Sequence, residues 1–264
     1  MTSGAAGTAG VAPFPGTRLP FFTWLRIYFR LFAVQGAWNY ETLLGNGIAF
    51  CMEPALRLLP GGRDGERYTQ ALARHARYFN AHPYFAGLAV GALARAELDG
   101  VEPSLIERFR IALGGPLGSV GDRLVWASWL PLCSLIALLV FGLDARPLVV
   151  VAIFLLLYNL GALSLRAWGL RVGFEKGLRV ADALGNPLLR RGPQYIGVVA
   201  AVLAGIAMPL AANRVIGAGR ETAAEVTVIA IVGGVLLSRL GGRAEGWRLA
   251  LAILALYVLF SVAR

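Results

Sequence analysis

The sequence has few residues that bind metals or form disulfides. Only two cysteines and two histidines occur among its 264 residues. Cys51 and Cys133 lie far apart in apolar surroundings, and together with His75 and His82 they cannot supply the ligand set of a zinc site at the usual spacing. We therefore expect no disulfide, no bound metal and no other cofactor.

The motifs of common enzyme classes are also missing. The sequence has no Walker motif, no serine, histidine and aspartate arranged as in a hydrolase with its nucleophile turn, and no dinucleotide-binding glycine pattern after a strand. No nucleophile with an adjacent base can be named. We therefore expect the chain itself to catalyse no reaction.

Charge is scarce, whereas hydrophobic residues are abundant. Only 15% of the residues are charged, 57% are hydrophobic, and the mean hydropathy is +0.65. These values predict an integral membrane protein in contact with lipid. The net charge of +10 comes mainly from arginines scattered between apolar runs. That distribution is typical of membrane topology and does not favour a nucleic-acid partner, which would require a basic face with aromatics.

The C-terminal part, residues 125–264, predicts membrane-spanning helices. Because a helix needs about 20 apolar residues to cross a bilayer, we expect an all-α, multi-pass fold here. The fourth apolar stretch is short, and Gly233 and Gly234 within it indicate either tight packing or a break. The five apolar stretches are Val125–Leu143, Pro147–Leu165, Tyr195–Ala212, Val226–Leu237 and Trp247–Val262.

The basic residues predict an orientation for these helices. The loop after the second apolar stretch is rich in arginine, whereas the loop before it holds only Arg146 opposite Asp144. The excess of positive charge places the N-terminus in the cytoplasm and, with five spans, Arg264 outside. Residues 1–17 lack a signal-peptide pattern and are rich in Gly, Ala, Pro and Ser, so we expect a disordered tail.

Residues 18–124 predict a second kind of region, a cytoplasmic-side or re-entrant core that carries polar motifs. Its apolar segments are too short, or too interrupted by Gly and Pro, to span simply. Broken elements at membrane depth line cavities and bind substrate in transporters. The stretch GGPLGSVGD is the most interrupted, and Asp122 at its end either caps the following helix or belongs to a transport site. We expect its glycines to be structural: Gly114, Gly115, Gly118 and Gly121.

The stretch QGAWNYE, residues 35–41, concentrates hydrogen-bonding groups in an apolar chain. Gln35, Asn39 and Glu41 offer donors and acceptors, while Trp38 and Tyr40 offer flat apolar faces. A sugar needs this mixture, because its hydroxyls require paired donors and acceptors and its C–H face packs on aromatic rings. The alternative is an interfacial aromatic belt with amides that cap a helix.

The stretch RHARYFNAHPY, residues 74–84, carries both histidines. We expect His75, Phe79 and His82 on one face of a helix that ends near Asn80, before Pro83. A phosphocarrier histidine is one interpretation. A structural histidine is favoured, because no acid stands at local spacing to orient the ring.

Four motifs together resemble a known family. In order and spacing, QGAWNYE, RHxxYFNxHPY, GGPLGSVGDxLVW and YNLxxLxLRxWGLxxGFEKG are similar to the IID component of the mannose/fructose/sorbose family of sugar phosphotransferase systems. That family's pattern reads QGSWNYE, RHLEFFNTHPY, GLMGPLAGIGDSLFW and NLxRxxxRYxGxxxGYxxG. The resemblance is strong from about Phe22 to Gly177 and looser through the C-terminal spans.

The resemblance implies a multi-pass subunit of the bacterial inner membrane that pairs with a IIC subunit to form the pathway of a hexose. It also implies several copies of each subunit in the complex, elevator-like movement of a core domain, and phosphate delivered by separate IIA and IIB proteins. The family motifs assign six residues of this chain to the sugar site: Gln35, Trp38, Asn39, Glu41, Asn80 and Asp122.

The sequence also departs from the family pattern. The acid Glu41 is followed by Thr42 and not by arginine, and Glu53 stands where an apolar residue is usual. An arginine of the last motif is replaced near Gly161 and Ala162. Two interpretations follow: a site for a different sugar, or a divergent subunit with a regulatory or scaffolding role and no transport.

Overall fold

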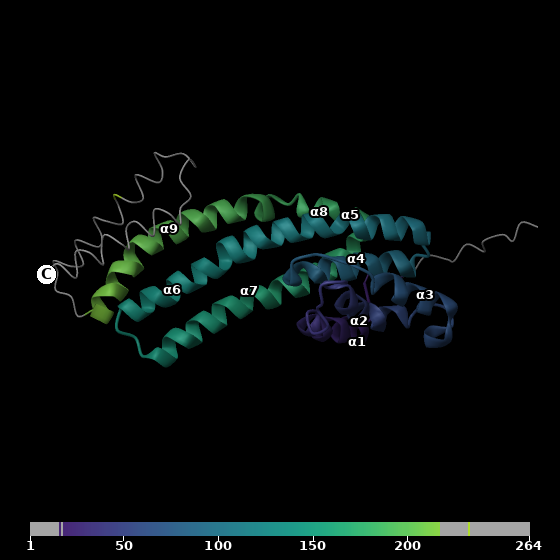
Figure 1. Ribbon diagram of the computed structural model, residues 1–264, viewed down its shortest axis with the longest axis horizontal. Helices are drawn as coiled ribbons and strands as arrows, with labels where there is room; N and C mark the ends of the chain where they lie inside the picture. The colour runs from purple at the N-terminus through teal and green to yellow at the C-terminus, as the bar shows by residue number, and fades with distance from the viewer. Residues whose placement is uncertain (1–15, 17, 217–231, 233–264) are drawn as a thin grey trace, which may run out of the picture. The chain divides into compact units, whose positions relative to one another are not determined.

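The computed structural model describes residues 16, 18–216 and 232, and the elements within this part of the chain are helices (Figure 1). They are α1 (Phe21–Arg30), α2 (Gly45–Leu56), α3 (Glu66–His75), α4 (Ala86–Leu98), α5 (Pro103–Gly121), α6 (Leu130–Gly142), α7 (Pro147–Lys176), α8 (Ala181–Leu184) and α9 (Pro187–Ile216), the 3₁₀ turns η1 (Leu31–Ala33), η2 (Gly62–Asp64), η3 (Pro83–Phe85) and η5 (Gly177–Arg179), and the π-helix η4 (Asp122–Trp129). The all-α prediction is confirmed.

The first four helices are too short to cross a membrane. They contain 10, 12, 10 and 13 residues, and at about 1.5 Å per residue none reaches the roughly 30 Å of a hydrocarbon core. This agrees with the interrupted apolar pattern of the N-terminal half. Figure 1 shows α1–α4 gathered together.

Three later helical runs are long and apolar enough to span a membrane. They cover Pro103–Gly142, Pro147–Arg179 and Ala181–Val215, and they overlap the first three predicted spans. The last two predicted spans, the tail and the C-terminal Arg264 lie outside the described residues, apart from residues 16 and 232.

The glycine-rich stretch 114–122 is helical, which corrects one prediction. The backbone continues from α5 into η4 without a break, so Asp122 lies inside a helical run and not at the start of a new helix. The prediction that Asp122 caps a new helix is therefore wrong. The four glycines and the proline of this stretch predicted a broken segment, but the structure forms a continuous helical run through them.

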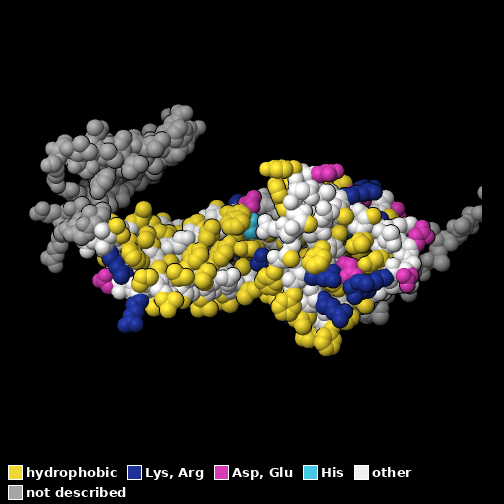
Figure 2. Space-filling model, turned by 60° about the horizontal axis from the view of Figure 1, so that its bottom comes forward, with side chains coloured by type: hydrophobic (Ala, Val, Ile, Leu, Met, Phe, Trp, Pro, Cys, Tyr) yellow, Lys and Arg dark blue, Asp and Glu magenta, His cyan; other side chains and the backbone are white. Residues whose placement is uncertain are grey.

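The described contacts divide the chain into two compact units. Unit 1 comprises Met1–Leu130 and Leu157–Ile196, and unit 2 comprises Pro131–Leu156 and Gly197–Arg264. The predicted domain boundary after residue 124 falls within η4 and stays a prediction. Figure 2 shows hydrophobic side chains over most of the visible surface of the long helices, whereas charged side chains gather over the short ones.

The core of unit 1 is built around α4. Every residue of this helix except Arg95 is buried. Gly91 of α4 lies against the backbone of α7, where an added Cβ would overlap the carbonyl oxygen of Leu170, and Gly173 of α7 lies equally close to Leu88. Glycine at these positions lets the two backbones approach closely, as at helix interfaces in membranes.

Candidate functional site

The loop from Gln35 to Leu44 uses the Asn39 amide to fix its own turn. The Asn39 Oδ1 accepts hydrogen bonds from the backbone N–H of Glu41 at 3.0 Å and of Thr42 at 2.9 Å. Its Nδ2 donates to Thr42 Oγ1 at 2.9 Å and to the Ala37 carbonyl at 3.2 Å. This is the local side-chain-to-backbone bonding that favours asparagine in turns. The Asn39 amide is therefore occupied locally.

The other polar and aromatic groups of this loop face outward. The Trp38 and Tyr40 rings meet edge to face with centroids 4.9 Å apart, and Tyr40 is 90% exposed. Gln35 and Glu41 are also exposed. The loop thus presents two rings, one amide and one carboxylate on the surface of this chain. Their contact with a sugar stays a prediction.

Three of the sequence motifs meet in unit 1. The Phe79 N–H donates to the Thr42 carbonyl at 3.1 Å, and the Leu44 N–H donates to the Phe79 carbonyl at 3.0 Å. An added Cβ at Gly114 would lie 2.7 Å from the Asn80 carbonyl oxygen. The second motif therefore lies between the segment that follows the first motif and the start of the third, and it contacts both.

The four predicted structural glycines differ in their surroundings. A Cβ at Gly121 would overlap the His82 side chain, and Gly114 packs on Asn80 as described. A Cβ at Gly115 or Gly118 would meet no atom of the described residues within 4 Å. Close packing among the described residues therefore accounts for Gly114 and Gly121 but not for Gly115 and Gly118.

The second motif folds differently from the prediction. Helix α3 ends at His75, so Phe79 and His82 do not share a helix face with it. His75 is fully buried, and its Nε2 lies 2.8 Å from Oε1 of Glu97 on α4. Burial raises the pKa of the Glu97 carboxyl, but hydrogen bonds from His75 and Arg74 outweigh burial and hold that pKa below its ordinary value. The acid that orients the ring is therefore present, 22 residues away.

Glu53 forms a second charged centre. Its carboxylate accepts hydrogen bonds from Arg57 at 2.6 Å, Arg30 at 2.9 Å, Arg63 at 3.1 Å and the Tyr68 hydroxyl at 3.1 Å. Burial raises the pKa of Glu53, but these bonds prevail and lower it to about 2. The unusual acid of the sequence therefore ties α2 to α1, η2 and α3.

A cluster of rings that the sequence analysis missed lies beside η4. We call it the ring cluster; it comprises His82, Tyr84, Trp126, Tyr158 and Arg166. The Tyr84 and Tyr158 hydroxyl oxygens are 2.8 Å apart, and the Arg166 guanidinium lies 4.0 Å from the centroid of the Tyr84 ring. The His82 ring centroid is 5.2 Å from those of Tyr84 and Trp126. The feature of the sequence that could have indicated this cluster is the histidine and aromatic content of the second and third motifs.

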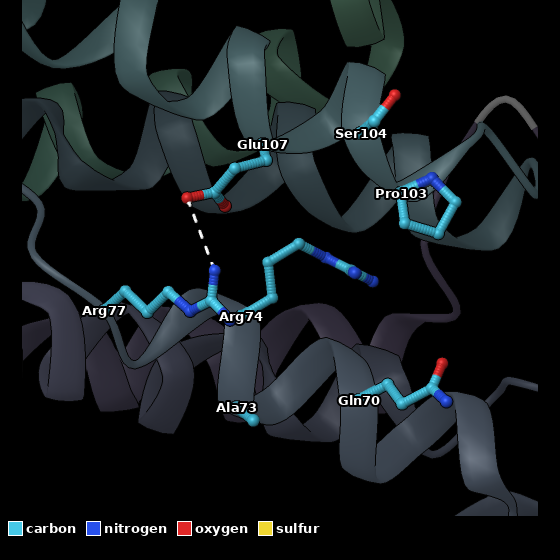
Figure 3. A pocket seen from close by; sticks show the side chains of 7 residues that line it. All are labelled: Gln70, Ala73, Arg74, Arg77, Pro103, Ser104 and Glu107. Carbon is cyan, nitrogen blue, oxygen red and sulfur yellow. Dashed lines mark ion pairs between the residues drawn. The ribbon is translucent and has the colours of Figure 1, made fainter.

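A cleft of about 450 Å³ lies between α3 and the start of α5 (Figure 3). Arg77 pairs with Glu107 across it at 3.9 Å, and Arg74, which also lines it, pairs with Glu97. Both arginines are thus engaged by acids. Its lining residues are Gln70, Ala73, Arg74, Arg77, Pro103, Ser104 and Glu107.

The described residues contain no group of three His, Cys, Asp or Glu side chains placed to hold a metal ion. Cys51 and Cys133 are both buried free thiols. Burial raises the pKa of Cys51 to about 12, so its thiol stays protonated at neutral pH.

Comparison with known proteins identifies the family. The chain matches the model of the PTS system mannose/fructose/sorbose family IID component over residues 22–211. It is 31% identical over 204 residues to the sorbose-specific EIID component of the PTS system of Klebsiella pneumoniae, which covers 71% of this chain and 72% of that protein.

Two further relatives extend the comparison. The mannose-specific EIID component of Escherichia coli strain K12 is 30% identical over 173 residues, covering 62% of this chain and 59% of the relative, so the chain spans about three-fifths of that protein's length. A solved structure of the mannose transporter ManYZ in complex with microcin E492 has a chain similar to this one, with a TM-score of 0.55, 27% identity, and coverage of 71% and 69%. The chain therefore belongs to the mannose/fructose/sorbose family of phosphotransferase-system IID components, and it is a membrane protein.

Proposed function

We propose that this chain is the IID membrane subunit of a hexose permease of the phosphotransferase system and forms the sugar pathway together with a IIC subunit. The family match over residues 22–211 is the observation that carries this proposal. The relatives named for mannose and sorbose indicate a hexose as substrate. The long apolar helices supply the membrane part of such a pathway.

Phosphate reaches the sugar from separate IIA and IIB proteins in this proposal. Both histidines of the chain support it, because His75 is fully buried and His82 is 2% exposed. A phosphocarrier histidine has to be reached by the partner that donates the phosphate. The complex contains several copies of each membrane subunit and lies in the bacterial inner membrane, with the N-terminus of this chain in the cytoplasm.

The proposed sugar-contacting residues are the exposed groups of the three converging motifs. Gln35, Trp38 and Glu41 come from the first, Asn80 from the second and Asp122 from the third. Asn39 supports the site indirectly, because its amide holds the turn that presents Trp38 and Glu41.

A divergent subunit with a regulatory or scaffolding role is the second candidate. The observation that favours it is the use of Glu53 as a structural centre for three arginines, at a position where the family pattern is apolar. In that case the chain pairs with a IIC subunit and moves no sugar.

The test is co-expression with a IIC subunit from the same organism, co-purification, and binding of labelled D-mannose, D-fructose and L-sorbose. We expect a stable complex that binds at least one of them. A stable complex that binds none supports the scaffolding role and contradicts the permease role.

Two variants refine the test of the first motif. Glu41→Gln is expected to weaken sugar binding at normal membrane abundance, because the Glu41 carboxylate is exposed and the side-chain hydrogen bonds that hold this turn come from Asn39. Asn39→Ala is expected to reduce both binding and abundance, because the turn loses four hydrogen bonds. Asn39→Asp keeps the acceptor oxygen and serves as the matched control.

A further inference from the structure

His82 offers a buried hydrogen-bond donor for which the described residues supply no acceptor. Its Nδ1 accepts the Tyr84 backbone N–H at 3.2 Å. Burial lowers the pKa of the ring to about 4, against the opposing charge of Asp122, so the ring is neutral at pH 7. In a neutral ring whose Nδ1 is the acceptor, the proton resides on Nε2. That N–H is buried and has no partner in the part of the chain described.

An exposed polar face lies next to this donor. Asp122 and Trp126 are four residues apart in the π-helix η4, and both are exposed although the run belongs to a candidate membrane span. π-helical turns are rare and are frequent at functional sites. An ionised carboxylate facing lipid is strongly unfavourable, so this face borders water, a partner or a substrate.

The remaining members of the ring cluster hold this face in position. Tyr84 lies between His82 and the Tyr158 hydroxyl, and Arg166 packs over the Tyr84 ring. Gly121 leaves room for the His82 side chain at the start of η4. The position of the imidazole is thus held by α5 at Gly121 and, through Tyr84, by α7.

We propose that His82, Trp126 and Asp122 form a hexose-binding face of this subunit. The C–H face of the pyranose packs on the Trp126 indole, the Asp122 carboxylate accepts a hydrogen bond from one hydroxyl, and the His82 Nε2–H donates to an oxygen of the sugar. Trp126 is 46% exposed, and its ring centroid lies 5.2 Å from that of His82. In this proposal a movement of the Trp126 side chain opens His82 Nε2 to the sugar. This inference rests on the proposed function, because it requires that the chain contacts a hexose.

The chemistry of the three groups matches a sugar and not a simple ion. One donor, one anionic acceptor and one aromatic face together satisfy a ligand that carries both hydroxyl hydrogens and hydroxyl oxygens beside an apolar face. An inorganic anion would be repelled by Asp122, and a cation would leave the His82 donor without an acceptor. The indole adds a contact that neither ion requires.

Two crossed substitutions at His82 separate its two nitrogens. In His82→Asn the side-chain oxygen can replace Nδ1 as acceptor for the Tyr84 N–H, while the Nε2 donor is lost. In His82→Gln the amide nitrogen reaches the Nε2 position, while the local acceptor is lost. We expect at least tenfold weaker binding of the labelled hexose for His82→Asn at normal membrane abundance, and a smaller loss of binding with reduced abundance for His82→Gln.

Trp126→Ala provides the test of the stacking surface, with Tyr78→Ala as the matched control. Tyr78 is also an exposed aromatic of unit 1, at 57%, and lies outside the ring cluster. With the co-purified IIC complex and labelled D-mannose, D-fructose and L-sorbose, we expect at least tenfold weaker binding for Trp126→Ala and unchanged binding for Tyr78→Ala.

Each outcome decides between the proposals. If the unmodified complex binds a sugar and both Trp126→Ala and His82→Asn bind it as Tyr78→Ala does, the hexose-binding face is overturned while the permease role stands. If these variants instead lose the IIC subunit during purification, the face is a subunit interface and the inference is again overturned. If the unmodified complex binds none of the sugars, the permease role fails and the inference fails with it.

Discussion

Units 1 and 2 of this protein are held together by different means. Unit 1 buries ionised and polar groups among short helices, including Glu53, Glu97 and Arg110. In the described part of unit 2 the buried side chains are small or apolar, such as Cys133 and Ala207, and large apolar side chains point outward. The helices of unit 2 therefore depend on the membrane for burial of their apolar surface, whereas unit 1 buries an apolar core of its own together with specific polar contacts.

The buried charges of unit 1 give the largest expected effect. Glu97→Ala would leave Arg74 and the buried His75 without their acid. Removal of one partner from a buried pair costs about 3–5 kcal/mol. We expect a large loss of membrane abundance and a lower thermal unfolding midpoint in detergent.

Glu66→Ala is the control for this change. Glu66 is an exposed acid of α3 whose described contact is a hydrogen bond from Gln70 at 2.8 Å. It should change stability by less than about 0.5 kcal/mol. Equal effects of the two substitutions would show that the buried network does not stabilise unit 1.

The second-largest loss of stability is expected at Gly121, which packs closely on His82. In Gly121→Val the side chain would overlap His82, so we expect a loss of about 1–3 kcal/mol from overpacking. Gly118→Ala is the control, because its new Cβ would meet no atom within 4 Å in the part of the chain that the structure describes. Membrane abundance of the two variants, measured side by side, checks this. A normal level of Gly121→Val would show that η4 can shift away from His82 at little cost.

The low pKa of Glu53 predicts that the stability of the folded protein falls in acid. Its pKa is about 2 in the folded chain and 4.5 ordinarily, so its contribution to stability is fully present above pH 4.5 and is lost as the pH falls toward 2. Unfolding midpoints in detergent across this range should fall more steeply for the unmodified protein than for Glu53→Gln. Parallel pH profiles would mean that the carboxylate contributes nothing through its charge.

Hydropathy alone predicted the long helices and the short length of the N-terminal segments. This prediction works because the length of an apolar run can be read from the sequence and compared directly with the thickness of the bilayer. It did not predict η4, since π- and α-helices share the same hydropathy, and it mistook the continuous run through Gly121 and Asp122 for a helix start.

The contacts within unit 1 could not be predicted from the sequence, for a different reason. The acid that orients His75 is 22 residues away, and the Tyr84 hydroxyl meets that of Tyr158 from a distance of 74 residues. Local spacing cannot reveal such partners, because they are brought together only by packing of α3, α4 and α7. The family resemblance supplied the motifs, and the structure supplied their neighbours.

The smallest effect is expected at a surface ion pair in unit 2. Arg214 lies 3.3 Å from Asp144, whose side chain is 86% exposed, and it also donates to the Ala145 carbonyl at 3.0 Å. Exposed pairs contribute about 0–1 kcal/mol, so Asp144→Asn should barely change the unfolding midpoint. Asp144 has a φ of +62°, which asparagine tolerates and valine does not. Asp144→Val should therefore be the more destabilising change, because backbone conformation outweighs charge at this turn. If Asp144→Asn were as costly as Asp144→Val, the ion pair would stabilise unit 2 and the contrast with unit 1 would be weaker.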